Sequence, residues 1–413
     1  MATAAQPSQT ATQPLSRRRW VILAIGVLAQ SAASAFIYGV PFLVPTLRDT
    51  LGLSLAQVGV YVAAPTVGLL CTLIAWGAAA DRWGERVVMA SGMAVASIGI
   101  GALVGLTHQS QHPPTWLLLV LLAIGGAGGA SVNAASGRMV MGWFPTTERG
   151  LAMGIRQTAQ PLGVGIAGLT LPTLAHHLGP FPAMVLPGTL CLLSAILIAA
   201  FAPDPPRAPR KAGDARPRSP YHEPLLFRVH ASSALLVVPQ FAVAAFTYEY
   251  LVHERHWSIA AAGTFAAVAQ LAGAGGRIGS GWWSDRVRSR LRPMRQLAVL
   301  AMLVLLMFAL GDAVTAPWLA WLAPAALALG AVITVADNGL GYTATAEIAG
   351  PAWSGRALGV QNTGQNVLSA LAPVTLGAVI GGSNYATGFA VAALAPLLAI
   401  AVIPVRSEPA PRW

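Results

Sequence analysis

The stretch Gly77-Ala-Ala-Ala-Asp81-Arg82-Trp83-Gly84-Glu85-Arg86 is the most informative part of this chain, because part of it occurs twice. Gly281, followed after three residues by Asp285-Arg286, repeats the spacing of Gly77 and Asp81-Arg82 at an offset of 204. Two copies of one polar loop at a fixed distance indicate an internal duplication.

The duplication extends beyond this loop. Residues 152–160 match residues 357–365 at an offset of 205, and Asn133 corresponds to Asp337 at 204. A strongly apolar chain that uses one structural unit twice is typical of a transporter whose binding site lies between its two halves.

The composition is that of a membrane protein. The chain is 55% hydrophobic and 9% charged, whereas soluble domains carry about 25% charged residues. Apolar runs of about 20 residues, the length that spans a bilayer, recur twelve times, six in each half. The sequence therefore predicts an all-α integral membrane protein. The expected spans are 20–45, 55–79, 87–107, 116–141, 151–174, 183–202, 229–251, 259–283, 296–314, 317–343, 356–380 and 385–404.

The net charge of +11 is distributed unevenly between the loops. If the N-terminus is cytoplasmic, the loops on that side hold 21 of the 25 basic residues. Arg48 and Arg255 lie in the opposite loops, and Arg156 and Arg277 fall inside spans. This is the positive-inside pattern, so we expect both termini in the cytoplasm and the chain in a bacterial inner membrane. The charge is poorly explained by nucleic-acid binding.

The chain divides into five segments. We expect a disordered tail over 1–16, a six-helix bundle over 17–202, a second over 229–405, and a tail over 406–413. Residues 203–228 contain seven prolines and six basic residues, which cannot pack a core and predict a cytoplasmic linker.

Twelve spans as six plus six, a basic central linker and the loop from Gly77 to Arg86 together resemble the major facilitator superfamily, over residues 17–405. The resemblance implies two pseudo-symmetric six-helix bundles and a monomer without cofactor. It also implies that the two loops latch the cytoplasmic side while the protein is open outward. The expected gate residues are Gly77, Asp81, Arg82, Gly84, Arg86, Asp285 and Arg286.

The chemistry of the first loop suits such a latch. Gly77 and Gly84 allow close helix approach and a tight turn. Asp81, at a helix end, can pair with arginines and cap the N-terminus of another helix. A purely structural role in fixing the turn is the alternative, and the two roles are compatible.

Arg156 and Arg277 are the most informative residues inside spans, because intramembrane charges are costly and usually functional. Both lie roughly 10 Å from the cytoplasmic helix ends. In the family fold their helices meet between the halves, so we expect the two guanidinium groups to share a cavity and to bind a carboxylate. The alternative for Arg277 is that it extends to the cytoplasmic surface.

Two carboxylates are candidates for proton coupling. Asp337, in the tenth span, which lines the cavity in the family fold, is the stronger candidate because burial disfavours a charged carboxylate. The equal alternative is that it only neutralises an arginine. The tripeptide Asp337-Asn338-Gly339 predicts an irregular helix at this point. Glu249 is the weaker candidate and is more typical of an outer gate.

The remaining expected substrate contacts are uncharged side chains. Gln361 and Gln365 form the counterpart of the Arg156 face, so one half offers an amide where the other offers a cation. Helix 1 faces the cavity in the family fold, which adds Tyr38 and Gln30 unless these only satisfy a neighbouring helix. The full set of expected substrate-binding residues is Arg156, Arg277, Asn133, Gln361, Gln365, Tyr38, Gln30 and Asn338.

The sequence thus predicts a secondary transporter of a small organic anion, a carboxylate, that works by alternating access with a proton. One alternative is efflux of hydrophobic drugs or metabolites, and another is a membrane sensor that binds ligand without moving it. His108 and His112 have the i,i+4 spacing of a zinc-protease helix, but Pro113 and Pro114 follow them and indicate a loop. No catalytic triad stands out either, so we expect neither an enzyme nor a metal site.

Overall fold

The computed structural model describes residues 17–53, 55–110, 113–205, 219–314, 319 and 321–409, and every regular element within them is a helix. The predicted all-α membrane fold is therefore confirmed. The predictions for the tail 1–16, for linker residues 206–218 and for residues 410–413 lie outside the described residues.

Within the described residues, each half contains eight α-helices. The first half contains α1 (Arg18–Ile37), α2 (Val44–Leu51), α3 (Leu55–Trp83), α4 (Glu85–Gln109), α5 (Thr115–Trp143), α6 (Arg149–Arg156), α7 (Ala159–Leu178) and α8 (Val185–Phe201). The second half contains α9 (Pro224–Glu249), α10 (Ile259–Val287), α11 (Leu291–Ala313), α12 (Leu322–Ala336), α13 (Asn338–Ala349), α14 (Ser354–Gly382), α15 (Tyr385–Ala392) and α16 (Leu394–Val402).

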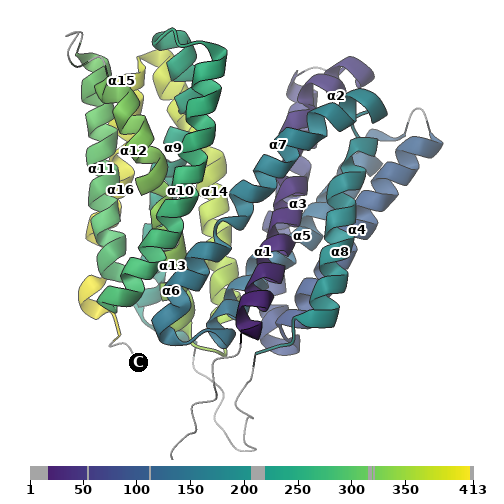
Figure 1. Ribbon diagram of the computed structural model, residues 1–413, viewed down its shortest axis with the longest axis horizontal. Helices are drawn as coiled ribbons and strands as arrows, with labels where there is room; N and C mark the ends of the chain where they lie inside the picture. Colours follow the sequence, from purple (N-terminus) through teal and green to yellow (C-terminus); the bar gives the residue numbers. More distant parts are fainter. Residues whose placement is uncertain are drawn as a thin grey trace, which may run out of the picture.

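Four pairs of these helices continue one another, so the sixteen form twelve rods. The pairs are α1 with α2, α6 with α7, α12 with α13, and α15 with α16 (Figure 1). Ten rods among the described residues are long and apolar enough to cross a membrane. The other two rods are α6 with α7, which carries Arg156, and α10, which carries Arg277.

The predicted linker ends earlier than expected. A 3-10 turn covers Pro220–His222, and α9 begins at Pro224 rather than near residue 229. Proline favours the first turn of a helix because its missing N–H would have no intrahelical partner there. Residues 224–228, which were expected in the linker, therefore belong to the first helix of the second bundle.

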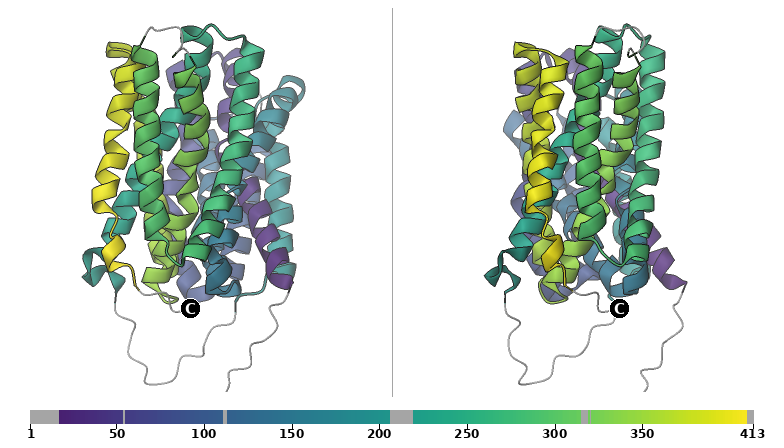
Figure 2. Two further views of the ribbon diagram at one scale, coloured as in Figure 1. Left: turned by 60° about the vertical axis from the view of Figure 1, so that its left-hand side comes forward. Right: turned by 90° about the vertical axis from the view of Figure 1, so that its left-hand side faces the viewer.

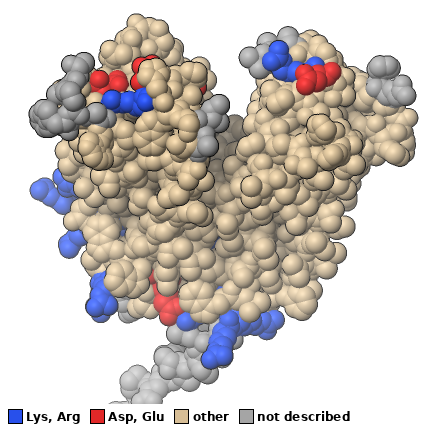
Figure 3. All heavy atoms as spheres, turned by 45° about the horizontal axis from the view of Figure 1, so that its top comes forward, with Lys and Arg blue, Asp and Glu red and all other residues tan. Residues whose placement is uncertain are grey.

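The two bundles meet at one end and separate at the other (Figure 1). We call the end at which α1 begins and α16 ends the terminal face, and the opposite end the open face; Figure 2 shows the helices running between them. Near the terminal face, α3 packs against α14, and α6 packs against α10. A space-filling view shows the hollow that opens between the bundles on the open face (Figure 3).

The outer surface is apolar between the two faces. Charged residues are scarce over the middle of the molecule in Figure 3, and large apolar side chains such as Ile98, Leu271 and Val374 are at least 71% exposed. Such side chains are stable on a surface that contacts lipid. The chain is therefore a multi-pass membrane protein.

Candidate functional site

A polar cavity lies between the two bundles. Its space is about 570 Å³, which includes part of the open cleft. Nine of the fifteen lining residues are Asn or Gln, and one is charged. The lining consists of Gln30, Tyr38, Asn133, Gln157 and Gln160 from the first half, and Val237, Gln240, Phe241, Arg277, Asn338, Tyr342, Asn362, Gln365, Asn366 and Ser369 from the second.

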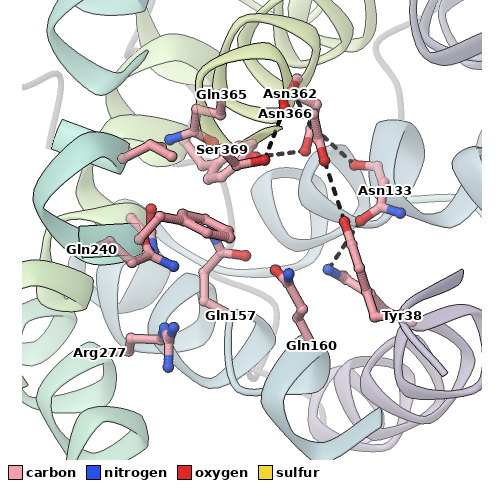
Figure 4. A pocket seen from close by; sticks show the side chains of 15 residues that line it. Tyr38, Asn133, Gln157, Gln160, Gln240, Arg277, Asn362, Gln365, Asn366 and Ser369 are labelled. Atoms are coloured by element: carbon pink, nitrogen blue, oxygen red, sulfur yellow. Dashed lines mark hydrogen bonds between the residues drawn. The ribbon is translucent and has the colours of Figure 1, made fainter. Parts of the chain in front are cut away.

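Helix α14 supplies the most regular part of this lining. Its contribution recurs at positions i, i+3, i+4 and i+7, which lie on one face of a helix. These residues are Asn362, Gln365, Asn366 and Ser369. In Figure 4 they form one wall of the cavity, and the Tyr38 hydroxyl donates a 3.2 Å hydrogen bond to Asn366 Oδ1 from the other bundle.

Arg277, on α10, is the charged residue of the lining. Its side chain lies across the cavity from Tyr38 and Asn133 (Figure 4). Arg277 is 6% exposed, and its Nη1 atom is buried without a hydrogen-bond partner. A buried guanidinium nitrogen without an acceptor is costly, so this atom is available to an anionic ligand.

Asp337 lies behind the lining, near Arg277. It is 3% exposed and occupies the break between α12 and α13, which confirms the irregular helix predicted at this tripeptide. Its charge attracts that of Arg277, but among the described residues no ion pair joins them directly. The next residue, Asn338, does line the cavity and donates a 2.9 Å hydrogen bond to Gln240.

Arg156 does not line the cavity with Arg277, which corrects the expectation that the two guanidinium groups share it. It is 1% exposed and lies directly behind the lining. Its Nη2 donates to the Asn133 carbonyl oxygen at 3.0 Å, and its Nη1 donates to Gln157 Oε1 at 3.2 Å. Nε donates to the Ser136 hydroxyl at 2.7 Å, and the guanidinium carbon lies 5.3 Å from the Tyr342 ring centroid. Arg156 therefore holds two lining residues in position.

Gln361 also points away from the cavity. It is 1% exposed, and its Oε1 accepts hydrogen bonds from His230 Nδ1 at 2.6 Å and from the Thr345 hydroxyl at 3.3 Å. Glu249 lies elsewhere, at the end of α9, where its side chain is 54% exposed and 3.4 Å from His253. Neither residue is among those that line the cavity.

The other predicted contacts do line the cavity. Gln30 donates to Asn133 Oδ1 at 3.3 Å and accepts a hydrogen bond from Ser136. Gln365 donates to the Ser233 carbonyl oxygen at 3.5 Å. Both ends of the Gln30 amide are therefore engaged, whereas the side-chain oxygen of Gln365 accepts no hydrogen bond from the described residues.

Asp81 makes the first of two hydrogen-bonded contacts between the bundles at the terminal face. Its carboxylate accepts hydrogen bonds from the backbone N–H groups of Gly355 and Arg356, at 2.9 and 3.1 Å, at the start of α14. Arg138 donates to the same carboxylate at 2.6 Å and pairs with Glu85 at 2.8 Å. A carboxylate at a helix N-terminus is favourable for the helix dipole.

Asp285 makes the second contact in the same way. It accepts hydrogen bonds from the N–H groups of Gly150 and Leu151, at 3.0 and 2.9 Å, in the first turn of α6. Arg290 pairs with Asp285 and with Glu347. The repeated aspartates of the sequence are therefore equivalent in space.

The remaining expected gate residues have different surroundings. Gly77 lies where α3 crosses α14. Gly84 has a φ of +97° and leads into α4, a conformation that favours glycine. The Arg86 N–H donates to Asp204, which follows the end of α8, at 2.8 Å. Arg82 and Arg286 are exposed and stack on Trp83 and Trp282.

Several lining residues were not predicted from the sequence. The signal that marks three of them, Gln157, Gln160 and Asn362, is symmetry, because Gln157 matches Asn362 and Gln160 matches the predicted Gln365 at the offset of 205. Polar residues at the same place in both halves of an apolar repeat indicate a shared cavity. Gln240, Phe241 and Ser369 carry no comparable signal.

Comparison with known proteins identifies the family. Residues 23–373 match the model of the Major Facilitator Superfamily. An uncharacterised transporter of this type from Mycobacterium tuberculosis is 40% identical over 95% of this chain and 86% of its own length. The hexuronate transporter of Bacillus subtilis is 27% identical over 63% of this chain and 62% of its own.

A solved structure has the same fold. The outward conformation of FucP, a major facilitator transporter, superimposes with a TM-score of 0.73 at 15% identity. The match covers 95% of this chain and all of the FucP chain. At this identity, the likeness concerns the fold alone.

Proposed function

The chain belongs to the major facilitator superfamily, and from this membership we propose that it moves a small organic anion, a carboxylate, by alternating access in symport with a proton. The superfamily consists of membrane transporters, and relatives include a hexuronate transporter. A hexuronate is an organic anion, which supports this substrate class.

Arg277 is the observation that carries the proposal. A guanidinium group is the side chain best suited to bind a carboxylate, which it can engage through two parallel hydrogen bonds. Arg277 lines the cavity, and its Nη1 has no acceptor among the described residues. An anionic substrate would supply that acceptor.

The substitution Arg277→Gln tests this role. It keeps a polar side chain of similar reach and removes the charge. We expect uptake of D-glucuronate into proteoliposomes to fall about tenfold to hundredfold, since hydrogen bonds to charged groups contribute about 1.5–3 kcal/mol.

Arg295→Gln is the matched control, because Arg295 is exposed on α11 and does not line the cavity. It removes the same charge and should leave uptake unchanged. Unaltered uptake in Arg277→Gln would refute the role of Arg277.

Asp337 is the proposed proton-coupling residue. It is buried, acts electrostatically on Arg277 and lies beside the cavity residue Asn338. When Asp337 is charged, it competes with the substrate for Arg277; when it is protonated, the arginine is free for the anion. Protonation and anion binding would therefore favour each other.

The coupling is tested with Asp337→Asn. We expect this variant to bind D-glucuronate and to exchange it across the membrane without responding to an imposed pH gradient. A variant in which the gradient still drives accumulation would exclude Asp337 as the coupling site.

The terminal-face contacts are the proposed cytoplasmic gate. In this arrangement the open face is the outer face, and both termini lie in the cytoplasm of a bacterium. The positive-inside pattern supports this orientation. Labelling of single cysteines at the exposed positions Trp83 and Val287 by a membrane-impermeant maleimide in intact cells would test it, because cytoplasmic positions should be protected.

Efflux of hydrophobic compounds receives little support from the cavity. Nine amides and an arginine line it, and an apolar ligand would remove these groups from water without replacing their hydrogen bonds. A compound that is transported equally well by the wild type and Arg277→Gln would favour this alternative.

A further inference from the structure

The hydrogen-bonding groups that face the cavity specify more than an anion. We infer that the neutral part of the substrate is a polyhydroxylated chain, so that the substrate is a sugar acid. This inference rests on the proposed anion transport and extends it to the part of the substrate that Arg277 does not contact.

The cavity presents nitrogen donors that no described residue of the protein uses. Five residues offer nitrogen donors that engage no acceptor within the part of the chain that the structure describes. These are Arg277 Nη1 and the side-chain amide nitrogens of Asn133, Gln157, Gln160 and Gln240. A ligand that fits must therefore be rich in acceptors, as a carboxylate with several oxygens is.

The cavity also offers acceptors that no donor uses. The side-chain oxygens of Gln160 and Gln365 receive no hydrogen bond from the described residues, although both residues line the space. A ligand with only acceptor atoms, such as a simple dicarboxylate, would leave these oxygens unpaired. The ligand must donate as well as accept.

Hydroxyl groups meet both requirements, since each donates one hydrogen bond and accepts up to two. A hydrocarbon chain in the same position would displace water and leave several buried amides without partners, which costs free energy for each group. The polar groups are also spread around the cavity, with Arg277 on one side and Asn133 on the other (Figure 4). We therefore expect hydroxyls along the length of the ligand and its carboxylate at Arg277.

The partner bonds of the lining make the free groups directional. Gln157 Oε1 is held by Arg156, and Gln240 Oε1 is held by Asn338. In both glutamines the oxygen is fixed, so the nitrogen faces the space. Such preorganised donors discriminate strongly, because a site built to bind a hydroxyl rejects an analogue that lacks it.

A matched set of four ligands tests the inference by calorimetry on the purified full-length protein. D-Gluconate and D-glucuronate carry both the carboxylate and the hydroxyls, hexanoate carries only the carboxylate, and D-glucitol carries only the hydroxyls. We expect at least one of the two sugar acids to bind at least about a hundredfold more tightly than hexanoate. D-Glucitol should bind weakly, as it has no charge for Arg277.

The results separate this inference from the proposed function. If hexanoate binds as tightly as the sugar acids and Arg277→Gln abolishes the binding of all three, the sugar-acid inference is wrong and anion transport stands. If no ligand of the four binds, or if Arg277→Gln changes nothing, the proposed function fails together with the inference.

Gln160→Leu provides a second, independent test. The side chain of Gln160 makes no hydrogen bond to a described residue, so Gln160→Leu removes none of the hydrogen bonds that the structure describes. We expect about tenfold weaker binding of the preferred sugar acid and unchanged binding of hexanoate. The control Gln270→Leu makes the same change at an exposed position of α10 and should affect neither ligand. Equal weakening of both ligands by Gln160→Leu would contradict a contact with hydroxyls.

Discussion

At the terminal face, α3 crosses α14 on one side of the molecule and α10 crosses α6 on the other, each at a pair of glycines. A Cβ on Gly77 would lie 2.3 Å from the carbonyl oxygen of Gly355, and one on Gly281 would lie 2.1 Å from that of Gly150. No side chain fits at these distances. The two crossings therefore use the same backbone contact, which the internal duplication supplies twice.

The ion pairs next to the two crossings differ. Arg138, on α5, binds Asp81 and Glu85, which belong to its own bundle. Arg290 binds Asp285 and also reaches the carbonyl oxygen of Thr146 in the other bundle, at 3.0 Å. Through these bonds Arg138 stabilises the bundle to which Asp81 belongs, whereas Arg290 also links the two bundles to each other.

One residue pair links this difference to the cavity. Leu73 and Arg277 are equivalent in the repeat, and each presents its carbonyl oxygen to a glycine of the crossing helix. A Cβ on Gly154 would lie 2.3 Å from the Arg277 carbonyl oxygen. At the crossing of α10 and α6, Arg277 extends a charged side chain into the cavity, and Leu73 at the other crossing does not. We therefore expect a bound anion to affect the contact between α10 and α6 rather than the contact between α3 and α14.

Valine at either crossing glycine should have the largest effect. Gly281→Val and Gly77→Val both place a side chain against a backbone carbonyl, and overpacking costs about 1–3 kcal/mol or more. We expect the ratio of closed to open terminal faces to fall about tenfold to hundredfold. Spin labels at Trp83 and Val287, in a protein without Cys71 and Cys191, would report the distance between the bundles.

Each helix offers a control for these substitutions. A Cβ on Gly279 of α10, or on Gly59 of α3, would meet no atom within 4 Å. Valine at these positions makes the same change in helix propensity and should leave the label distance as in the wild type. A terminal face that remains closed in Gly281→Val would show that the crossing is not tight.

The two arginines should separate folding stability from closure. Glu85 is 0% exposed, so Arg138→Gln should lower the free energy of unfolding by about 3–5 kcal/mol, as expected when one partner of a buried ion pair is lost. Arg290→Gln should instead open the terminal face, because Arg290 spans it. Thermal unfolding and the label distance would distinguish these effects, and identical results for both variants would contradict the distinction.

Arg290 should stabilise closure at every practical pH. Burial by itself lowers the pKa of Arg290, but Glu347 and Asp285 more than compensate and raise it above its ordinary value. A raised pKa means that the stabilisation is present below the unfolded pKa, which for arginine is above about 12. We therefore expect the effect of Arg290→Gln on the label distance to be the same at pH 6 and pH 9.

The fold and the terminal-face contact were predictable because they depend on local patterns. Apolar runs of sufficient length define the rods, and the glycine and aspartate of each repeated loop lie in the last turns of a helix that packs against the other bundle. The sequence indicated that Asp81 could cap another helix, and the structure shows it bonded to Gly355 and Arg356. The identity of that helix depends on tertiary packing.

The cavity lining was predictable only in part, because one residue along a helix changes direction by about 100°. Gln361 lies next to Asn362, yet Asn362 faces the cavity and Gln361 faces His230. The sequence pointed to positions where the halves differ, such as Arg156 and Gln361. The matched amides, among them Gln157 and Asn362, proved to be the better indication.

Arg156→Gln sharpens the comparison between the halves, because it gives the first half the residue that the second half has at Gln361. Arg156 holds Asn133 and Gln157 but does not line the cavity. We expect ligand binding to weaken by less than about tenfold, and the free energy of unfolding to fall by about 1–3 kcal/mol as buried bonds are lost. For Arg277→Gln we expect the opposite, a larger loss of ligand binding and a smaller decrease in the free energy of unfolding. Calorimetry and thermal unfolding of both variants would check this, and a larger loss of binding in Arg156→Gln would place the ligand nearer to Arg156.

Glu249→Gln should have the smallest effect, and it compares the open face with the interior. The Glu249 side chain is 54% exposed and pairs with His253, which is 65% exposed. Exposed ion pairs contribute little free energy, and a solvated carboxylate exchanges protons with water independently of substrate. Asp337, by contrast, is buried next to the arginine that faces the cavity. We therefore expect uptake driven by a pH gradient to change less than about twofold in Glu249→Gln and to be lost in Asp337→Asn. If the gradient instead fails to drive uptake in Glu249→Gln while Asp337→Asn remains coupled, the proton enters at the open face and Asp337 serves only to neutralise Arg277.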